Sequence, residues 1–257
     1  MATVLSPFKQ AIVRAWWQAR PRVALSVVRD GDAVLVRDAS HSLRILSEPR
    51  ARLYKRGIRI RLRRLAAAYG VPAYVSIRPG DTVVDVGANV GEFSIYAAER
   101  GARVIAIEPD AYTFQCLEQN CRSIESIELI RAAIWETDAR RLFNVDPDEA
   151  NGSLVNQGPG SGDWMETKRL DTLLSSHSIG TIRLIKADVE GAEPELLKGA
   201  SETLKKTEYI SMDCGMERQG HQTSDTCAEI LRGLGFRIVR QQRRYRWNLI
   251  GANSSLS

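Results

Sequence analysis

The chain has 257 residues, of which 44% are hydrophobic and 26% charged, so it is long enough to bury a full core without disulfides or repeats. Charged residues interrupt each apolar run before it reaches the roughly 20 residues of a helical membrane span, which excludes that class on the sequence pattern. The net charge of +5 is uneven, because residues 1–80 carry 16 Lys/Arg against 4 Asp/Glu and the others carry 20 against 27. Such a basic beginning favours an anionic partner.

The first residues place Lys9, Arg14 and Arg20 among apolar side chains and lack the uninterrupted apolar core of a secretory signal, so a cytoplasmic location is expected. The four cysteines have no C-x2-C spacing, and the three histidines are far apart in the sequence. We therefore expect reduced structural thiols, no metal site and metal-independent chemistry.

Residues 1–78 are expected to form a basic N-terminal extension. Apolar residues from Phe8 to Trp16 recur at helical spacing, and Pro21 stops that helix. Residues 23–28 and 33–36 flank an Asp-Gly pair at 30–31, which indicates a hairpin. A second helical pattern spans 48–69, contains eight basic residues and ends at Gly70.

After Gly80 short apolar runs alternate with helical segments, which predicts a parallel sheet covered by helices on both faces. The expected strands are Thr82–Val86, Val104–Ile107, Ile127–Ile130, Ile182–Ala187 and Tyr209–Met212. The segment from Trp135 to Thr167 is rich in Gly, Asn, Asp and Pro and is expected to form a loop or short hairpins near the site. Residues 236–239 and 247–250 predict an antiparallel pair that closes the sheet. Residues 79–257 are thus expected to form one α/β domain.

A glycine-rich turn follows the first of these strands. The run DTVVDVGANVGEF places Asp85 near the strand end and Gly87, Asn89 and Gly91 in the turn, with a helix beginning near Gly91. Such a turn lets a ligand approach the backbone, and the helix N-terminus offers unpaired amides. The next strand ends at Glu108, whose carboxylate can accept both hydroxyls of a ribose. Turn and acid together predict a nucleoside site.

The turn does not have the G-x-G-x-x-G spacing of dinucleotide folds, and Asp85 and Glu92 flank it. Two carboxylates would repel a pyrophosphate but would tolerate the zwitterionic methionine end of S-adenosylmethionine. The residues therefore favour S-adenosylmethionine over a nicotinamide cofactor.

Three segments resemble the FkbM-type methyltransferases, a branch of the class I S-adenosylmethionine-dependent fold. They are PGDTVVDVGANVGEFS at 79–94, IRLIKADVEGAEPELLKGA at 182–200 and YISMDCGMERQG at 209–220. The likeness covers roughly residues 79–251, and the K-x-D-V-E-G-x-E run is its most specific part. The third segment is similar to a D-x-G-x-E-R variant, whereas many relatives carry Glu and then His near that position.

The resemblance implies a Rossmann-like sheet of about seven mostly parallel strands with a reversed last strand, and O-methylation of a small molecule, sugar or natural product. Position by position, it implies that the first glycine-rich segment holds the methionine moiety, Glu108 the ribose, and Pro109 with Asp110 the border of the adenine. Ala133 would lie along the other side of the adenine, and Asp188 would face the methyl group. The implied methionine-binding residues are Asp85, Gly87, Ala88, Asn89 and Gly91.

Carboxylates near the transferred methyl group are the candidates for general-base help. Strand alternation puts Lys186 and Asp188 on one face of the sheet. Asp188 lies at the carboxyl end of its strand, where open α/β sheets bind ligands, and Glu190 follows in the turn. Asp213 follows the next strand, where Glu217 and Arg218 either line the acceptor pocket with it or form a surface ion pair. Glu193 is best explained by its place at a helix N-terminus.

Two other classes of function remain open. An RNA methyltransferase would use the same core, and the arginines between residues 50 and 64 would neutralise phosphates, although few aromatic side chains suited to stacking accompany them. A peripheral membrane or partner-binding module would use residues 1–80 against an anionic surface. The sequence identifies neither the acceptor nor the oligomeric state.

Overall fold

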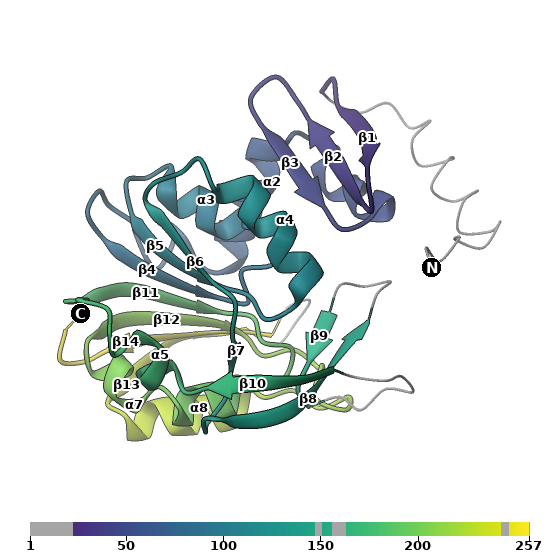
Figure 1. Cartoon of the computed structure of the whole chain (residues 1–257). Helices are drawn as coiled ribbons and strands as arrows, with labels where there is room; N and C mark the ends of the chain where they lie inside the picture. Colours follow the sequence, from purple (N-terminus) through teal and green to yellow (C-terminus); the bar gives the residue numbers. More distant parts are fainter. Residues whose placement is uncertain (1–22, 147–150, 156–162, 243–246, 257) are drawn as a thin grey trace.

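A seven-stranded sheet forms the centre of the protein in a computed structural model that describes residues 23–146, 151–155, 163–242 and 247–256 (Figure 1). The strand order is β13-β14-β12-β11-β4-β5-β6. Its strands are β4 (Thr82–Val86), β5 (Arg103–Ile107), β6 (Ile127–Ile130), β11 (Ile182–Ala187), β12 (Thr207–Asp213), β13 (Phe236–Gln241) and β14 (Asn248–Asn253). The strands predicted from apolar runs are all present, and the class I methyltransferase architecture is confirmed.

Strand direction places several strand ends at one edge of the sheet. β4 pairs in parallel with β5 and β11, and the β5–β6 and β11–β12 pairs are also parallel. β14 is antiparallel to both β12 and β13, as the family resemblance implied. The carboxyl ends of β4, β5, β11 and β12 therefore meet at one edge, where ligands bind in open α/β sheets.

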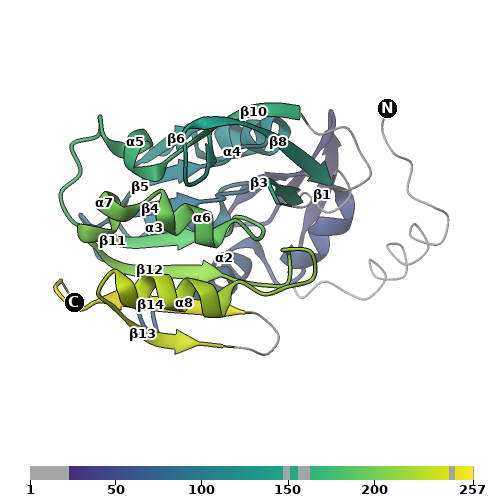
Figure 2. The ribbon, with the colours of Figure 1, turned by 90° about the horizontal axis from the view of Figure 1, so that it is seen from below.

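Helices cover both faces of the sheet (Figure 2). Successive residues of a strand point to opposite faces, so Val83 packs in one apolar core and Val84 in the other. The first core includes residues of α2 (Ile58–Ala68), α3 (Glu92–Ala98) and α4 (Ala111–Cys121). The second includes residues of α5 (Leu170–Leu174), α6 (Glu193–Lys198), α7 (Ser201–Lys205) and α8 (Ser224–Gly233). Both faces of the sheet are thereby buried.

The chain before the central sheet forms a three-stranded antiparallel sheet and two helices. β1 (Ser26–Asp30) and β2 (Ala33–Arg37) pair across Gly31, and β3 (Ser42–Ile45) adds to β2. The sequence pattern did not include β3. Arg44 and Asn120 join β3 to α4, because the Arg44 amide donates to Asn120 Oδ1 at 2.7 Å and Asn120 Nδ2 donates to the Arg44 carbonyl at 2.9 Å.

The continuous helix expected over 48–69 is instead two helices, a 3-10 helix η1 (Glu48–Tyr54) and α2. Gly57 separates them with a φ of 103°, a backbone conformation outside any right-handed helix. The amide of Ile58 donates to Asp38 Oδ2 at 2.7 Å and fixes the start of α2. The helix expected around Phe8–Trp16 lies outside the described residues.

The segment expected to form a loop or short hairpins supplies the antiparallel strands of a small second sheet, whose strand order is β7-β10-β8-β9. Its strands are β7 (Ala133–Ile134), β8 (Ala139–Asp146), β9 (Asn151–Ser153) and β10 (Asp163–Lys168). We call residues 135–168 the insert. Within the part of the chain that the structure describes, no helix has the length and apolar character needed to cross a membrane.

Candidate functional site

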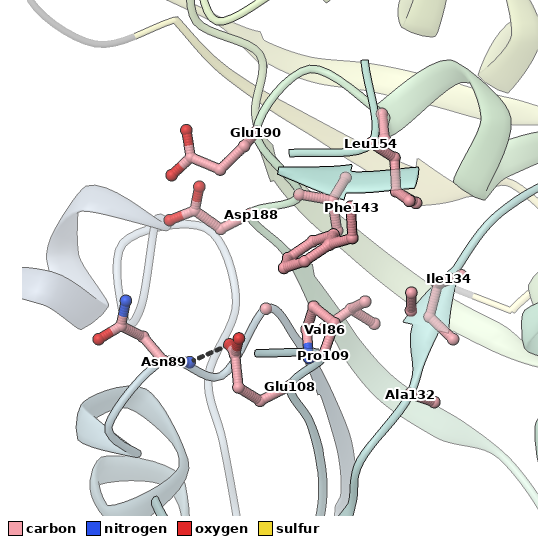
Figure 3. Close-up of a pocket in the computed structure, with 14 residues that line it drawn as sticks. Val86, Asn89, Glu108, Pro109, Ala132, Ile134, Phe143, Leu154, Asp188 and Glu190 are labelled. Carbon is pink, nitrogen blue, oxygen red and sulfur yellow. Dashed lines mark hydrogen bonds between the residues drawn. The ribbon is translucent and has the colours of Figure 1, made fainter. Parts of the chain in front are cut away.

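A cavity of about 620 Å³, counted with the space open to solvent, lies at the carboxyl ends of β4, β5 and β11 (Figure 3). Figure 3 shows Asn89, Asp188 and Glu190 along one side of it and Ala132, Ile134 and Leu154 along the other. The cavity therefore has a polar wall, built by the tips of the parallel strands, and an apolar wall.

The glycine-rich turn after β4 forms part of the polar wall. The amides of Gly87 and Ala88 both donate to the carbonyl of Ile107, at 2.9 Å each, so the turn is fastened to the end of β5. Asn89 follows with a φ of 52°, which Asn tolerates better than most residues. Its amide donates to Glu108 Oε2 at 2.9 Å. The turn and the acid of β5 thus face each other across a single hydrogen bond.

Gly87 is required by its surroundings as well as by its φ of 73°. A Cβ added there would overlap the backbone carbonyl of Asp188, and neither backbone can move without disturbing a strand end. The close approach of these two backbones brings the turn of β4 and the tip of β11 into contact.

Gly87→Ala should therefore destabilise the protein far more than Gly80→Ala. Gly80 has a similar φ of 87°, but a Cβ there would meet nothing within 4 Å. The backbone conformation alone costs about 1–2 kcal/mol for a residue with a side chain. We expect the free energy of unfolding of Gly87→Ala, measured with urea, to be lower than that of Gly80→Ala by at least about 2 kcal/mol. Equal losses would contradict the steric argument.

Glu108 directly follows β5 and is only 7% exposed. Burial raises the pKa of its carboxyl to about 7, although hydrogen bonds from the amides of Asp110 and Asn89 and the charge of Lys186 act in the opposite direction. The Asp110 amide donates to Oε1 at 3.1 Å, and the Asp110 side chain caps α4 by accepting from the Thr113 amide at 2.7 Å. Asp110 thus contacts Glu108 through its backbone while its own carboxylate serves the helix.

A buried ion pair lies beneath the glycine-rich turn. Lys186 Nζ is 3.0 Å from Asp85 Oδ1 and donates to the carbonyl of Gly87 at 2.6 Å. Ser94 Oγ donates to the other Asp85 oxygen at 2.6 Å, and Asp85 itself is 0% exposed. Asp85 and Lys186 therefore support the turn from below.

The pairing of these charges corrects one step of the sequence argument. Asp85 and Glu92 were treated as open negative charges that would repel a pyrophosphate, but Lys186 neutralises the first, and Arg61 binds the second through two hydrogen bonds of 2.8 and 2.7 Å. Because both carboxylates are compensated, they do not discriminate between ligands by charge. The sequence feature that still argues against a dinucleotide cofactor is the absence of the G-x-G-x-x-G spacing.

Asp188 and Glu190 form the acidic end of the polar wall. The hydroxyl of Tyr69 donates to Asp188 Oδ2 at 2.5 Å. Glu190 has a φ of 52°, a strained conformation for a residue of its size and one that is concentrated at functional sites. Burial raises the pKa of Glu190 to about 9, and the neighbouring carboxylates add to the effect, Asp188 most strongly. Burial and the neighbouring carboxylates therefore favour the protonated form of Glu190.

Two further carboxylates, those of Glu193 and Glu195 in α6, are held by hydrogen bonds within the protein. Glu193 accepts from Thr223 Oγ1 at 2.7 Å and from the Gly191 amide at 3.1 Å, and burial raises its pKa to about 7. Arg218 binds Glu195 through two hydrogen bonds of 2.8 and 2.9 Å. Arg218 thus forms an ion pair with the buried Glu195, a partner that neither sequence alternative named.

The apolar wall comes from the chain after β6 and from the insert. Ala132, Ala133 and Ile134 contribute to it, together with Phe143 of β8 and Leu154, and Pro109 adds apolar surface from the end of β5. Phe143 is 4% exposed although it belongs to a strand of the small second sheet. The polar composition of the insert gave no signal for either Phe143 or Leu154.

The structure gathers many of the sequence-predicted residues around the cavity and leaves others outside its lining. Those that line it are Gly87, Asn89, Glu108, Pro109, Ala133, Asp188 and Glu190. Asp85, Ala88, Gly91, Asp110 and Asp213 do not belong to the lining. The individual roles assigned to both groups stay predictions. Tyr69 and Lys186, which hold Asp188 and the turn, were not among the predicted site residues.

Residues 85–238 match the family model described as "Methyltransferase FkbM domain". This range is more than half of the chain and includes all of the residues that line the cavity.

Several curated proteins are similar in sequence. The 31-O-demethyl-FK506 methyltransferase FkbM of Streptomyces tacrolimicus is 28% identical, over 65% of this chain and 77% of that protein. The hexuronic acid methyltransferase AglP of Haloferax volcanii is 29% identical, over 52% of this chain and 55% of that protein. The 2-O-methyltransferase NoeI of Sinorhizobium fredii is 28% identical, over 52% and 63%. The chain thus spans less than two thirds of the last two relatives.

Among solved structures, fibrillarin of Aeropyrum pernix, crystallised with natively bound S-adenosyl-L-methionine, superposes with a TM-score of 0.50. The superposition covers 90% of this chain and 100% of that chain at 13% identity. At this identity the likeness concerns the fold alone.

Proposed function

Because the chain belongs to the FkbM methyltransferase family, whose members depend on S-adenosylmethionine, we propose that it transfers a methyl group to a hydroxyl of a small molecule or sugar. The observation that carries the proposal is the contact between the glycine-rich turn and Glu108 at the edge of one cavity. The named acceptors of the relatives, which include a hexuronic acid, support this class of acceptor.

The residues present fit S-adenosylmethionine. The close approach of Gly87 to Asp188 leaves backbone rather than side chains at the turn, as a methionine moiety requires. The Glu108 carboxylate is placed to accept ribose hydroxyls, and Pro109, Ala133 and Phe143 offer apolar surface for an adenine. Asp85, Ala88, Gly91 and Asp110 would act indirectly, by shaping the turn and the end of β5.

The chain's own contribution near the acceptor is alignment and charge. S-adenosylmethionine, when bound, supplies an electrophilic methyl group on a sulfonium. Asp188 lies at the carboxyl end of β11, where we place it beside the sulfonium and within reach of the acceptor hydroxyl. Glu190, whose protonated form is favoured, is suited to donate a hydrogen bond to the acceptor rather than to take its proton. Asp213 is buried outside the cavity lining, and we propose that it acts on Glu190 through charge.

Part of the basic surface favours a second candidate function, contact with an anionic partner. Arg59, Arg63 and Arg64 lie on the exposed face of α2, whereas Arg61 is held by Glu92. Three exposed arginines on one helical face can neutralise phosphates of RNA or of an anionic lipid surface. Binding of an RNA oligomer or of anionic vesicles that weakens steeply with salt would support this candidate.

Titration calorimetry with S-adenosylmethionine tests the proposal, and its pH dependence tests the role of Glu108. The ribose hydroxyls need an ionised carboxylate, but the pKa of Glu108 is raised to about 7, so a proton must leave before binding at lower pH. We expect binding at pH 6 to be about tenfold weaker than at pH 8. Adenosine has the ribose but no titrating amino group, so it should show the same ratio.

Failure of S-adenosylmethionine to bind at either pH would refute the proposed function, and pH-independent adenosine binding would remove Glu108 from it. Where binding is found, incubation with sugars and other hydroxyl compounds, read by a gain of one methyl group in the mass spectrum, identifies the acceptor.

A further inference from the structure

Tyr69 joins the N-terminal part of the chain to the cavity. It follows the last residue of α2 and lies outside the family-matched range that begins at residue 85. Its side chain is 0% exposed, yet its hydroxyl donates to Asp188 Oδ2 at 2.5 Å across a sequence separation of 119 residues. A hydrogen bond from a hydroxyl to a carboxylate is among the stronger kinds in proteins, and this one is short.

The ring of Tyr69 is held on more than one side. It meets the ring of Phe93 edge to face, with ring centroids 5.8 Å apart and an interplanar angle of 75°. Lys186 Nζ lies 5.3 Å from the Tyr69 ring centroid and is itself fixed by Asp85 and the Gly87 carbonyl. The Tyr69 amide donates to the Leu65 carbonyl at 3.2 Å and fastens the residue to α2. The hydroxyl is therefore aimed by packing and has little freedom to turn away.

We propose that Tyr69 is a positioning residue that holds the Asp188 carboxylate in the orientation needed at the sulfonium end of the cofactor. This inference rests on the proposed function. Asp188 follows β11 at the rim of a cavity open to solvent. The Tyr69 hydroxyl restrains it, and the residues before the central sheet thereby contribute to the site.

Affinities for two ligands that differ at sulfur provide an acceptor-free test. S-adenosylmethionine carries a sulfonium, whereas S-adenosylhomocysteine has the same adenosyl and amino-acid parts around a neutral sulfur. The ratio of the two affinities, measured by calorimetry on the full chain, reports the charge and orientation of Asp188. We expect Asp188→Asn to lower this ratio about tenfold, as for loss of one favourable charged contact. Tyr69→Phe, which keeps the ring and loses only the hydroxyl, should lower it about three- to tenfold.

Tyr54→Phe is the matched control. Tyr54 is also buried in the N-terminal part, and burial together with the neighbouring Glu92 carboxylate raises the pKa of its hydroxyl. Tyr54→Phe removes the same hydroxyl from a buried tyrosine, so we expect it to change thermal unfolding about as much as Tyr69→Phe does. Its affinity ratio should stay within about twofold of that of the unsubstituted protein.

A double-mutant cycle completes the test. If Tyr69 acts through Asp188, Tyr69→Phe changes the ratio no further in the Asp188→Asn background. An unchanged ratio in Tyr69→Phe alone would overturn the inference, and so would effects of the two substitutions that multiply. In either case S-adenosylmethionine would still bind, whereas failure of the proposed function would appear as no binding in the unsubstituted protein.

Discussion

Glu108→Ala weakens S-adenosylmethionine binding by at least about a hundredfold if its carboxylate accepts the ribose hydroxyls. Two hydrogen bonds to a charged group contribute about 1.5–3 kcal/mol each, and their joint loss corresponds to roughly 10²- to 10⁴-fold in affinity. The substitution also leaves the amides of Asn89 and Asp110 without the oxygens that they now contact, so the turn is less well ordered for binding. Calorimetry with the purified variant measures the loss.

Glu118→Ala serves as the control, because Glu118 is an exposed glutamate of α4. Its affinity should equal that of the unsubstituted protein within error. Thermal unfolding of both variants separates a binding defect from a folding defect. If Glu108→Ala is folded and binds within about threefold of normal, the ribose is held elsewhere and the nucleoside interpretation of the β5 acid is wrong.

Asp188→Asn is expected to lower kcat by about 10²- to 10⁴-fold with the acceptor found by screening, the range usual for loss of a general base. The thermal unfolding midpoint should change little, because Asn keeps the shape of Asp and can still accept from Tyr69. Binding of S-adenosylmethionine should weaken by only about tenfold, so most of the effect belongs to the reaction step.

Glu190→Gln gives an informative comparison at the same end of the cavity. The raised pKa of about 9 favours the neutral form of Glu190 at pH 7, and Gln imitates that neutral form. We therefore expect a smaller loss of kcat than for Asp188→Asn. The exposed Glu202→Gln controls for the loss of a carboxylate elsewhere. Equal losses for Asp188→Asn and Glu190→Gln would mean that the roles assigned to the two acids are not distinct.

The central sheet was predictable because its signal is local. Strands β4, β6 and β11 begin and end where their apolar runs do, since each lies between two covered faces and cannot tolerate a charge that lacks a partner. The fully buried charge pair among them, Lys186 with Asp85, consists of neighbours in register across β11 and β4. The sequence pattern already predicted that β13 and β14 are antiparallel to each other, but only the family resemblance implied that the last strand is the reversed one.

The candidate site was predictable where it follows the backbone and not where it depends on distant contacts. The turn after β4 and the acid ending β5 are fixed by their position along the chain. Tyr69 reaches Asp188 from 119 residues away, and no periodic pattern marks such a pair. The burial of Phe143 depends on how the insert packs against the cavity. The sequence showed the charges of Asp85 and Glu92 but not the residues that pair with them, Lys186 and Arg61.

The spacing of Lys186 and Asp188 links the two ends of the cavity through one strand. Lys186 is in register with Asp85 and donates a hydrogen bond to the carbonyl of Gly87. Asp188, two residues further along, lies at the acidic end of the polar wall. A slip of β11 by a single residue would turn both side chains to the opposite face of the sheet. The strand β11 therefore fixes the distance between the glycine-rich turn and the Asp188 carboxylate. Variation in acceptor preference is then left to the segments around the cavity rim, where a change of length does not alter that separation.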